Sequence, residues 1–149
     1  MLKFQEILED LILEKKMSLR NLEKESGVLA MSFSKYLKGS IPSIDISVKL
    51  ANYFNCSLDY LFGVSESRES NFSSSYDLEV FIPRYEKALK ENKTSHWKFC
   101  KATGLNESTL RHWKYGEKPS MNSLVIIATN LSTSIDYLVG RNQLNKDRP

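Results

Sequence analysis

The stretch SLRNLEKESGVLAMSFSKYLKG, residues 18–39, decides the fold of this chain. Ser18 precedes a short amphipathic segment and Gly27 ends it, which are start and stop signals of a helix. Another short helix must begin almost at once, because the chain reaches Gly39 only twelve residues after Gly27. The stretch therefore predicts two short helices joined by a tight glycine-containing turn.

The same pattern returns in residues 95–116 as SHWKFCKATGLNESTLRHWKYG. A shift of 77 residues superposes the two halves of the chain without a gap. It pairs Gly27 with Gly104, Gly39 with Gly116, Pro42 with Pro119, Ala51 with Ala128, and SLDYLFG at 57–63 with SIDYLVG at 134–140. An internal repeat of this kind predicts two copies of one fold.

Each copy is expected to form five consecutive short helices. Apolar residues in the first helix have amphipathic spacing, at Phe4, Ile7, Leu8, Leu11 and Ile12 in one copy and at Phe81, Tyr85, Ala88 and Leu89 in the other. Serines predict the starts of later helices, at Ser18, Ser43 and Ser57 and at Ser95, Ser120 and Ser134. Five helices in roughly sixty residues leave no room for a sheet.

We therefore expect an all-α fold with two tandem five-helix domains, at residues 1–63 and 78–140. The stretch between them, VSESRESNFSSSYD at 64–77, is Ser-rich and too polar to bury itself, so we expect a linker. Residues 141–149 have the same polar character, and we expect them to form a short flexible tail.

Composition is that of an ordinary globular protein, with 149 residues, 41% hydrophobic and 26% charged. The net charge of +3 is uneven, because residues 78–140 hold nine Lys and Arg against six Asp and Glu. A polyanion-binding face is thus allowed in the second half. No apolar run approaches the ~20 residues of a membrane helix, and Met1 to Leu13 is acidic where an export signal is basic, so we expect a cytoplasmic protein without membrane segments.

Cys56 and Cys100 are expected to be free thiols, and no cluster of ligands suggests a metal site or a cofactor. His96 and Cys100 share a helix face and could in principle share a metal, but no further ligand lies nearby in the sequence. The chain has no glycine-rich phosphate loop, and neither His has an evident nucleophile partner. We therefore do not expect an enzyme.

Both copies resemble the DNA-binding domain of the Cro and phage-repressor (XRE) type, found in bacterial and phage transcriptional regulators. The resemblance is carried by SLRNLEKESG and LKGSIPSID in the first copy, by ATGLNESTLRHWKYGEKPS in the second, and by the S(L/I)DYL(F/V)G ending of both. It implies two lambda-repressor-like five-helix domains. The sequence departs from the family where a small Ala is usual, at Glu23 and Cys100; Cys100 is small enough to pack, whereas Glu23 should widen the helix pair or turn outward.

The resemblance also implies that the third helices enter the major groove of DNA. In the second copy the implied DNA-binding residues are His96, Asn106 as the helix cap, Glu107, Ser108, Arg111, His112, Lys114, Tyr115 and Lys118. In the first copy they are Leu19, Ala30, Met31, Ser34, Lys35 and Lys38. Because the second set is polar and its domain basic, the second copy should supply more of the sequence specificity. Leu105, Leu110 and Trp113 have core spacing.

The first copy leaves two interpretations open, because Leu29, Ala30 and Met31 form an apolar strip where polar residues are expected. Such a strip can touch thymine methyls, or it can bind protein, including a second chain in a homodimer. The leading hypothesis is a sequence-specific transcriptional regulator, acting as a repressor by occupying a promoter. The alternative is a protein-interaction module, such as an antitoxin or inhibitor, that retains the helix-turn-helix fold.

Overall fold

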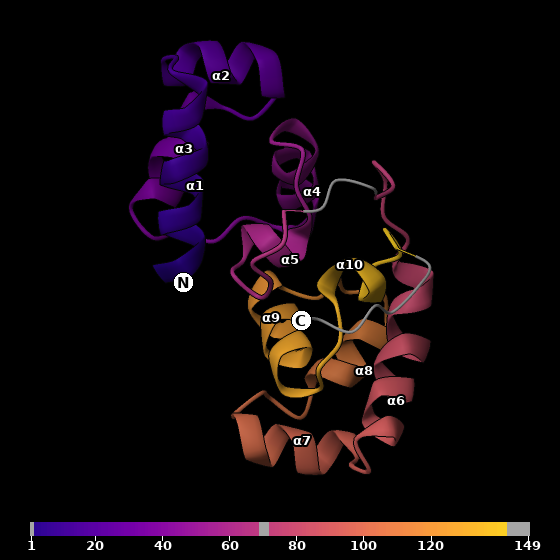
Figure 1. Ribbon diagram of the computed structural model, residues 1–149. Coiled ribbons are helices and arrows are strands. Elements are labelled where there is room, and N and C mark those ends of the chain that lie inside the picture. Colours follow the sequence, from indigo (N-terminus) through magenta and orange to yellow (C-terminus); the bar gives the residue numbers. More distant parts are fainter. Residues whose placement is uncertain (1, 69–71, 143–149) are drawn as a thin grey trace. The chain divides into compact units, whose positions relative to one another are not determined.

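The computed structural model describes residues 2–68 and 72–142, and within these ranges its regular elements are all helices, as the sequence predicts. The chain divides into two compact units, unit 1 at Met1–Asn71 and unit 2 at Phe72–Pro149 (Figure 1). Among the described residues, no helix has the length and apolar character needed to cross a membrane.

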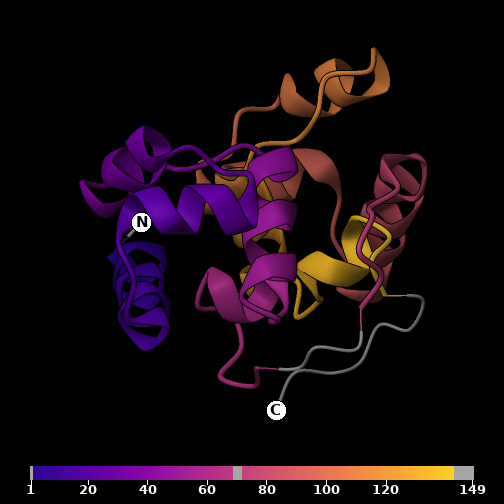
Figure 2. The ribbon, with the colours of Figure 1, turned by 90° about the horizontal axis from the view of Figure 1, so that it is seen from above.

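Unit 1 holds five helices: α1 (Leu2–Lys15), α2 (Leu19–Ser26), α3 (Ala30–Leu37), α4 (Ile44–Tyr53) and α5 (Leu58–Leu61). Three predicted serine caps are confirmed, because the side chains of Ser18, Ser43 and Ser57 accept hydrogen bonds from the backbone N–H three residues ahead. Helix α3 packs against α1 and α2, and α5 packs against α1 and α4 (Figures 1 and 2). This packing holds the α2–α3 pair on a closed core.

The core of unit 1 is aromatic where its first, third and fifth helices meet. The rings of Phe4 and Phe62 stack with centroids 4.7 Å apart, and Phe4 meets Tyr36 edge-on at 6.2 Å. The predicted apolar residues of α4 and α5 are buried as well, at Ile44, Val48, Ala51, Phe54, Leu58, Leu61 and Phe62. Of the predicted stripe on α1, Phe4, Leu8 and Leu11 are buried, and Ile7 and Ile12 are half-buried.

Unit 2 holds the short 3₁₀ helix η1 (Leu78–Val80) and then α6 (Phe81–Glu91), α7 (His96–Thr103), α8 (Thr109–Lys114), α9 (Met121–Asn130) and α10 (Ile135–Leu138). The 77-residue shift carries the bounds of α2, α4 and α5 onto those of α7, α9 and α10. Helix α8 differs, because it begins at Thr109 whereas the shift would start it at Glu107. The serine caps at Ser95, Ser120 and Ser134 are again present.

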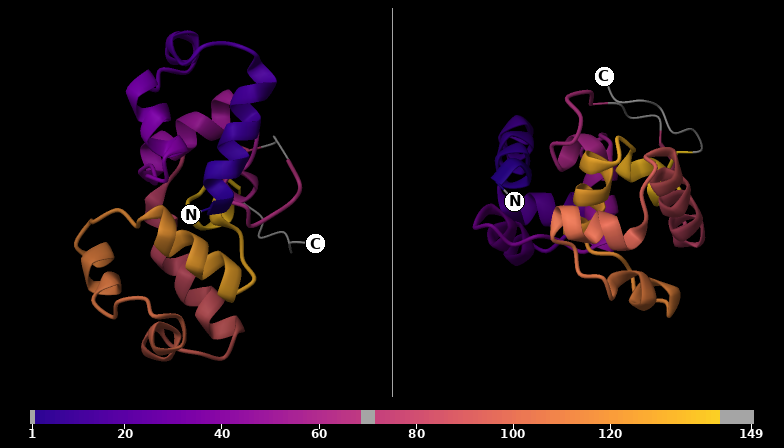
Figure 3. Two further views of the ribbon diagram at one scale, coloured as in Figure 1. Left: turned by 90° about the vertical axis from the view of Figure 1, so that its left-hand side faces the viewer. Right: turned by 90° about the horizontal axis from the view of Figure 1, so that it is seen from below.

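Tyr85 lies at the centre of the unit 2 core and is fully buried. The centroid of its ring lies 6.1 Å from those of Phe81 and Phe99 and 5.7 Å from that of Trp113. These contacts join α6, α7 and α8, whose ribbons are seen from two further sides in Figure 3. Trp113 is buried, as predicted, whereas Leu105 and Leu110 are only half-buried. The aromatic side chains therefore form this part of the core, and Leu105 and Leu110 contribute less to it than the sequence predicts.

Arg141 corrects the expectation of a flexible tail that begins at residue 141. Its guanidinium lies 2.6 Å from a carboxylate oxygen of Asp136, and the two side chains are 2% and 0% exposed. Arg141 also donates to the carbonyl of Ser73, and the N–H of Ser73 donates to the carbonyl of Arg141. Both Arg141 and Ser73, from the expected tail and linker, therefore belong to the fold of unit 2. Residues 143–149 of the expected tail lie outside the described residues.

Replacing Arg141 by Ala should destabilise unit 2 by about 3–5 kcal/mol, because it removes the cationic member of a buried ion pair and leaves the negative charge of Asp136 in the core. Both tryptophans of the chain, Trp97 and Trp113, lie in unit 2, so tryptophan fluorescence during urea unfolding reports on this unit. Lys101→Ala breaks an exposed ion pair of the same unit and should cost less than about 1 kcal/mol. Equal losses for both variants would contradict the assignment.

Candidate nucleic-acid interface

The turn between α2 and α3 is closed by one glycine and one carboxylate. Gly27 has φ +79°, a left-handed conformation that glycine adopts cheaply, and its N–H donates to the carbonyl of Glu23. The side chain of Glu23 crosses the turn, where its Oε1 accepts a 2.7 Å hydrogen bond from the N–H of Ala30. Glu23 therefore ties α2 to the first residue of α3, rather than turning outward as the sequence suggested.

The turn between α7 and α8 is closed differently. Gly104 again has a positive φ, but Asn106 Oδ1 accepts from both the N–H and the hydroxyl of Ser108, at 2.9 and 2.8 Å. Asn106 thus caps a turn that precedes the helix. Glu107 and Ser108, expected at the start of the third helix, lie in this turn because α8 begins only at Thr109.

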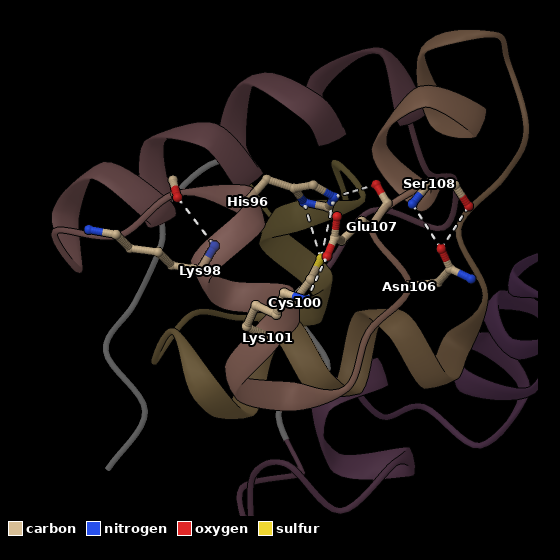
Figure 4. Close-up of polar contacts among 8 residues, drawn as sticks. His96, Lys98, Cys100, Lys101, Asn106, Glu107 and Ser108 are labelled. Carbon is tan, nitrogen blue, oxygen red and sulfur yellow. Dashed lines mark hydrogen bonds and ion pairs between the residues drawn. The ribbon is translucent and has the colours of Figure 1, made fainter.

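His96, which the resemblance implies contacts DNA, connects the core of unit 2 to the turn before α8. Its Nδ1 lies 2.7 Å from the Tyr85 hydroxyl. Its Nε2 lies 3.0 Å from the carbonyl oxygen of Glu107, a contact drawn in Figure 4. Cys100 Sγ lies 3.4 Å from the same Nε2. Both ring nitrogens are therefore engaged within unit 2.

The exposed side of α8 and the turn after it form a surface that we call the predicted reading face of unit 2. It is made up of Arg111, His112, Lys114, Tyr115 and Lys118. All five are exposed, and Tyr115 is 86% exposed. His112 Nδ1 lies 3.2 Å from the Glu117 carboxylate, and Lys118 Nζ lies 3.1 Å from the Tyr76 hydroxyl. The negative charge of the nearby Glu107 is partly offset by Lys101, whose Nζ lies 3.4 Å from the Glu107 carboxylate. The result is a basic face with one exposed aromatic ring.

Trp97 is an exposed residue on α7 that the sequence analysis did not select. It is 58% exposed, and Lys101 Nζ lies 5.5 Å from its ring centroid. The i, i+4 spacing of these two residues was a signal, because it places them on one helix face. Trp97 thus adds an apolar surface to the basic side of α7.

The reading face of unit 1 consists of Leu29, Met31, Lys35 and Lys38, all exposed. Leu29 and Met31 are 60% and 69% exposed, so the apolar strip lies on the surface as predicted. Leu19, Ala30 and Ser34, also expected to meet DNA, are half-buried. This face therefore combines two apolar side chains with two lysines.

The two cysteines are buried free thiols, as expected. Burial, with a smaller contribution from the negative charge of Glu107, raises the pKa of the Cys100 thiol. Within the described residues, no group of three or more His, Cys, Asp or Glu side chains is placed to hold a metal ion. Cys100 therefore lies beside His96 as a neutral thiol.

A helix-turn-helix family model matches residues 8–61, from within α1 to the end of α5. The match covers the α2–α3 pair with its connecting turn and leaves unit 2 unmatched. Neither the curated proteins nor the solved structures include a match to this chain. Residues 8–61 are therefore similar in sequence to helix-turn-helix proteins.

Both thiols should react slowly with a thiol reagent in the native chain at pH 8. Cys56 and Cys100 are 2% and 3% exposed, and the raised pKa of Cys100 lowers the fraction of reactive thiolate. In denaturant both should react at the rate of a free cysteine. Release of the coloured leaving group from an Ellman-type reagent measures this. Rapid labelling of one thiol in the native protein would contradict the burial of that residue.

Proposed function

We propose that this chain is a DNA-binding transcriptional regulator that presents α3 and α8 to the major groove. The observation that carries the proposal is the helix-turn-helix match of residues 8–61, together with the shifted recurrence of α2, α4 and α5 as α7, α9 and α10. This recurrence supports a second helix-turn-helix domain in unit 2. Binding DNA by such domains needs no catalytic group, so we propose a regulator rather than an enzyme.

In unit 2, Arg111 is the residue we propose for direct base readout. Its guanidinium is exposed on α8, and arginine binds guanine O6 and N7 with two parallel hydrogen bonds. Lys114, Tyr115 and Lys118 are then placed to contact phosphates, which orient the helix without reading sequence. His112 keeps one ring nitrogen for a base while Glu117 holds the other.

In unit 1, Met31 and Lys35 are the residues proposed to contact bases. The exposed Met31 side chain suits a thymine methyl group, and Lys35 suits guanine. These are weaker discriminators than a bidentate arginine, so we assign most of the specificity to unit 2.

We further propose repression by promoter occupancy, with two reading heads on each chain. Residues 64–77 were expected to form a free linker able to stretch ~45 Å. Arg68 instead binds Glu14 and the carbonyl of Phe54 within unit 1, and Ser73 binds Arg141 within unit 2. Residues 69–72 lie between these two contacts in the sequence. Tethering still raises the effective concentration of the second head.

Protein binding by unit 1 is the second candidate, favoured by the exposure of Leu29 and Met31 at 60% and 69%. An apolar face of this kind also suits a second copy of the chain, and we propose homodimerisation on a palindromic site. Sedimentation of the free protein at micromolar concentration tests this. A stable monomer that protects an asymmetric DNA site in footprinting would overturn the dimer.

Arg111→Ala should weaken binding to a selected DNA site by about 1–3 kcal/mol, the value of one bidentate base contact. The site is obtained by selection from random duplex DNA with the full chain, and affinity is measured by fluorescence anisotropy. Met31→Ala is the matched change in unit 1 and should cost less. If Met31→Ala costs more than Arg111→Ala, the division of roles between the units is wrong.

DNA affinity should fall steeply as salt rises, because lysine and arginine side chains displace counterions from phosphates. Lys114→Ala should weaken binding to all sequences alike and lower the slope of log K against log salt by about one unit. A complex held by the Leu29 and Met31 surface would instead be nearly insensitive to salt. Titrations at several salt concentrations therefore separate the two candidate functions.

A further inference from the structure

In each unit, one side chain from the first helix of the helix-turn-helix pair is bonded to the backbone at an equivalent place. That place is Ala30 in unit 1 and Glu107 in unit 2, which the 77-residue shift pairs. The two side chains come from different positions of the repeat. The 77-residue shift pairs His96 with Leu19, and Glu23 lies four residues after Leu19. Since residues four apart share a helix face, both reach the same turn from α2 or α7.

In unit 1 the contact supplies a missing helix cap. The first N–H groups of any helix lack partners within the helix, and Leu29, which precedes α3, has no side-chain acceptor. Glu23 Oε1 provides that acceptor to the N–H of Ala30 at 2.7 Å. A hydrogen bond to an ionised carboxylate is stronger than a neutral one, which suits a contact that must hold a short helix.

In unit 2 the contact determines which nitrogen of the His96 ring carries the hydrogen. The carbonyl oxygen of Glu107 can only accept, so Nε2 of His96 must carry the hydrogen. In the neutral form of the imidazole, Nδ1 then accepts from the Tyr85 hydroxyl at 2.7 Å. Burial raises the pKa of Tyr85, which keeps that hydroxyl protonated as a donor. The contacts therefore run from Tyr85 on α6 through His96 on α7 to Glu107 in the turn before α8, and Figure 4 shows the step from His96 to Glu107.

The two units carry different residues at four positions that the 77-residue shift pairs. Unit 1 has Leu8, Leu19, Glu23 and Ala30 where unit 2 has Tyr85, His96, Cys100 and Glu107. A buried tyrosine hydroxyl needs a partner, and His96 is that partner, whereas the buried Leu8 needs none. The small Cys100 leaves room for the His96 ring, whose Nε2 lies 3.4 Å from the Cys100 sulfur.

We propose that Glu23 and His96 are positioning residues that fix α3 and the α7–α8 turn for DNA binding, and that His96 does so in place of contacting DNA. This inference rests on the proposed function and adds the residues that orient its two reading helices. A reading helix must be held within a fraction of an ångström to place its side chains on base edges, and residues whose own contacts are fixed provide that support.

The first experiment needs no DNA. The chain has two histidines, and ring ¹⁵N shifts at about pH 8, above the usual His pKa of about 6.5, report the tautomer of each. His112→Gln assigns the signals. We expect His96 in the Nε2–H form, and we expect Tyr85→Phe to weaken that preference. A His96 ring in the Nδ1–H form, or averaging between forms in the unaltered protein, would overturn the proposal for unit 2.

The second experiment measures DNA affinity of the full chain on the selected duplex. His96→Ala and Glu23→Ala should each weaken binding about tenfold, the size of one net hydrogen bond. His96→Gln keeps an N–H donor and Glu23→Gln keeps a carbonyl acceptor, so each should recover most of the loss. Thermal unfolding identifies any variant that loses affinity by failing to fold.

Several outcomes would overturn the positioning role. One is wild-type affinity in a folded His96→Ala or Glu23→Ala variant; another is failure of the glutamine variants to recover binding. A drop in the salt slope for His96→Ala would also overturn it, because it would mean that His96 contacts a phosphate. Failure of the unaltered chain to select any duplex would contradict the proposed function itself, while the tautomer measurement would still decide the His96 contact.

Discussion

The backbone N–H groups at the start of each helix are the constraint on which this structure depends. A chain of short helices has many such groups, and each needs an acceptor. Six helices begin behind a serine whose side chain supplies one, at Ser18, Ser43, Ser57, Ser95, Ser120 and Ser134. Helices α3, α6 and α8 are exceptions, since the residues before them give no side-chain cap. The helices proposed to read DNA are therefore held by contacts from elsewhere in their units.

These contacts make the two units chemically unlike although their helices are closely matched. Unit 1 holds its turn with a carboxylate on α2 and exposes Leu29 and Met31 beside it. Unit 2 holds its turn with the half-buried His96, which is bonded to the buried Tyr85, and exposes a basic face with Tyr115. A common scaffold thus carries one apolar and one polar surface, which is the physical basis for assigning different roles to them.

Two arginines attach the segments on either side of the unit 2 helices to the core. Arg84 donates to the carbonyls of Tyr137 and Asn142, and Arg141 binds the buried Asp136. Both arginines also lie over aromatic rings, of Tyr137 and Phe72. Separating the buried Arg141–Asp136 ion pair would cost free energy, because it would leave a buried charge uncompensated. Residues 72–77 and 139–142 therefore remain attached to the helical core. This attachment turns part of an apparent linker into domain structure.

The sequence by itself determined the helices, the 77-residue recurrence, the serine caps and most of the buried residues, because these depend on local spacing and local hydrogen bonds. It also predicted the exposed basic set around Arg111 and the exposed strip at Leu29 and Met31. Only the tertiary structure decided what Glu23, His96 and Arg141 do. Each is a polar residue that local pattern places on a surface, and each finds its partner across a turn or between segments far apart in the chain. These partners are set by how the helices pack against one another, and the sequence of a single helix does not determine that packing.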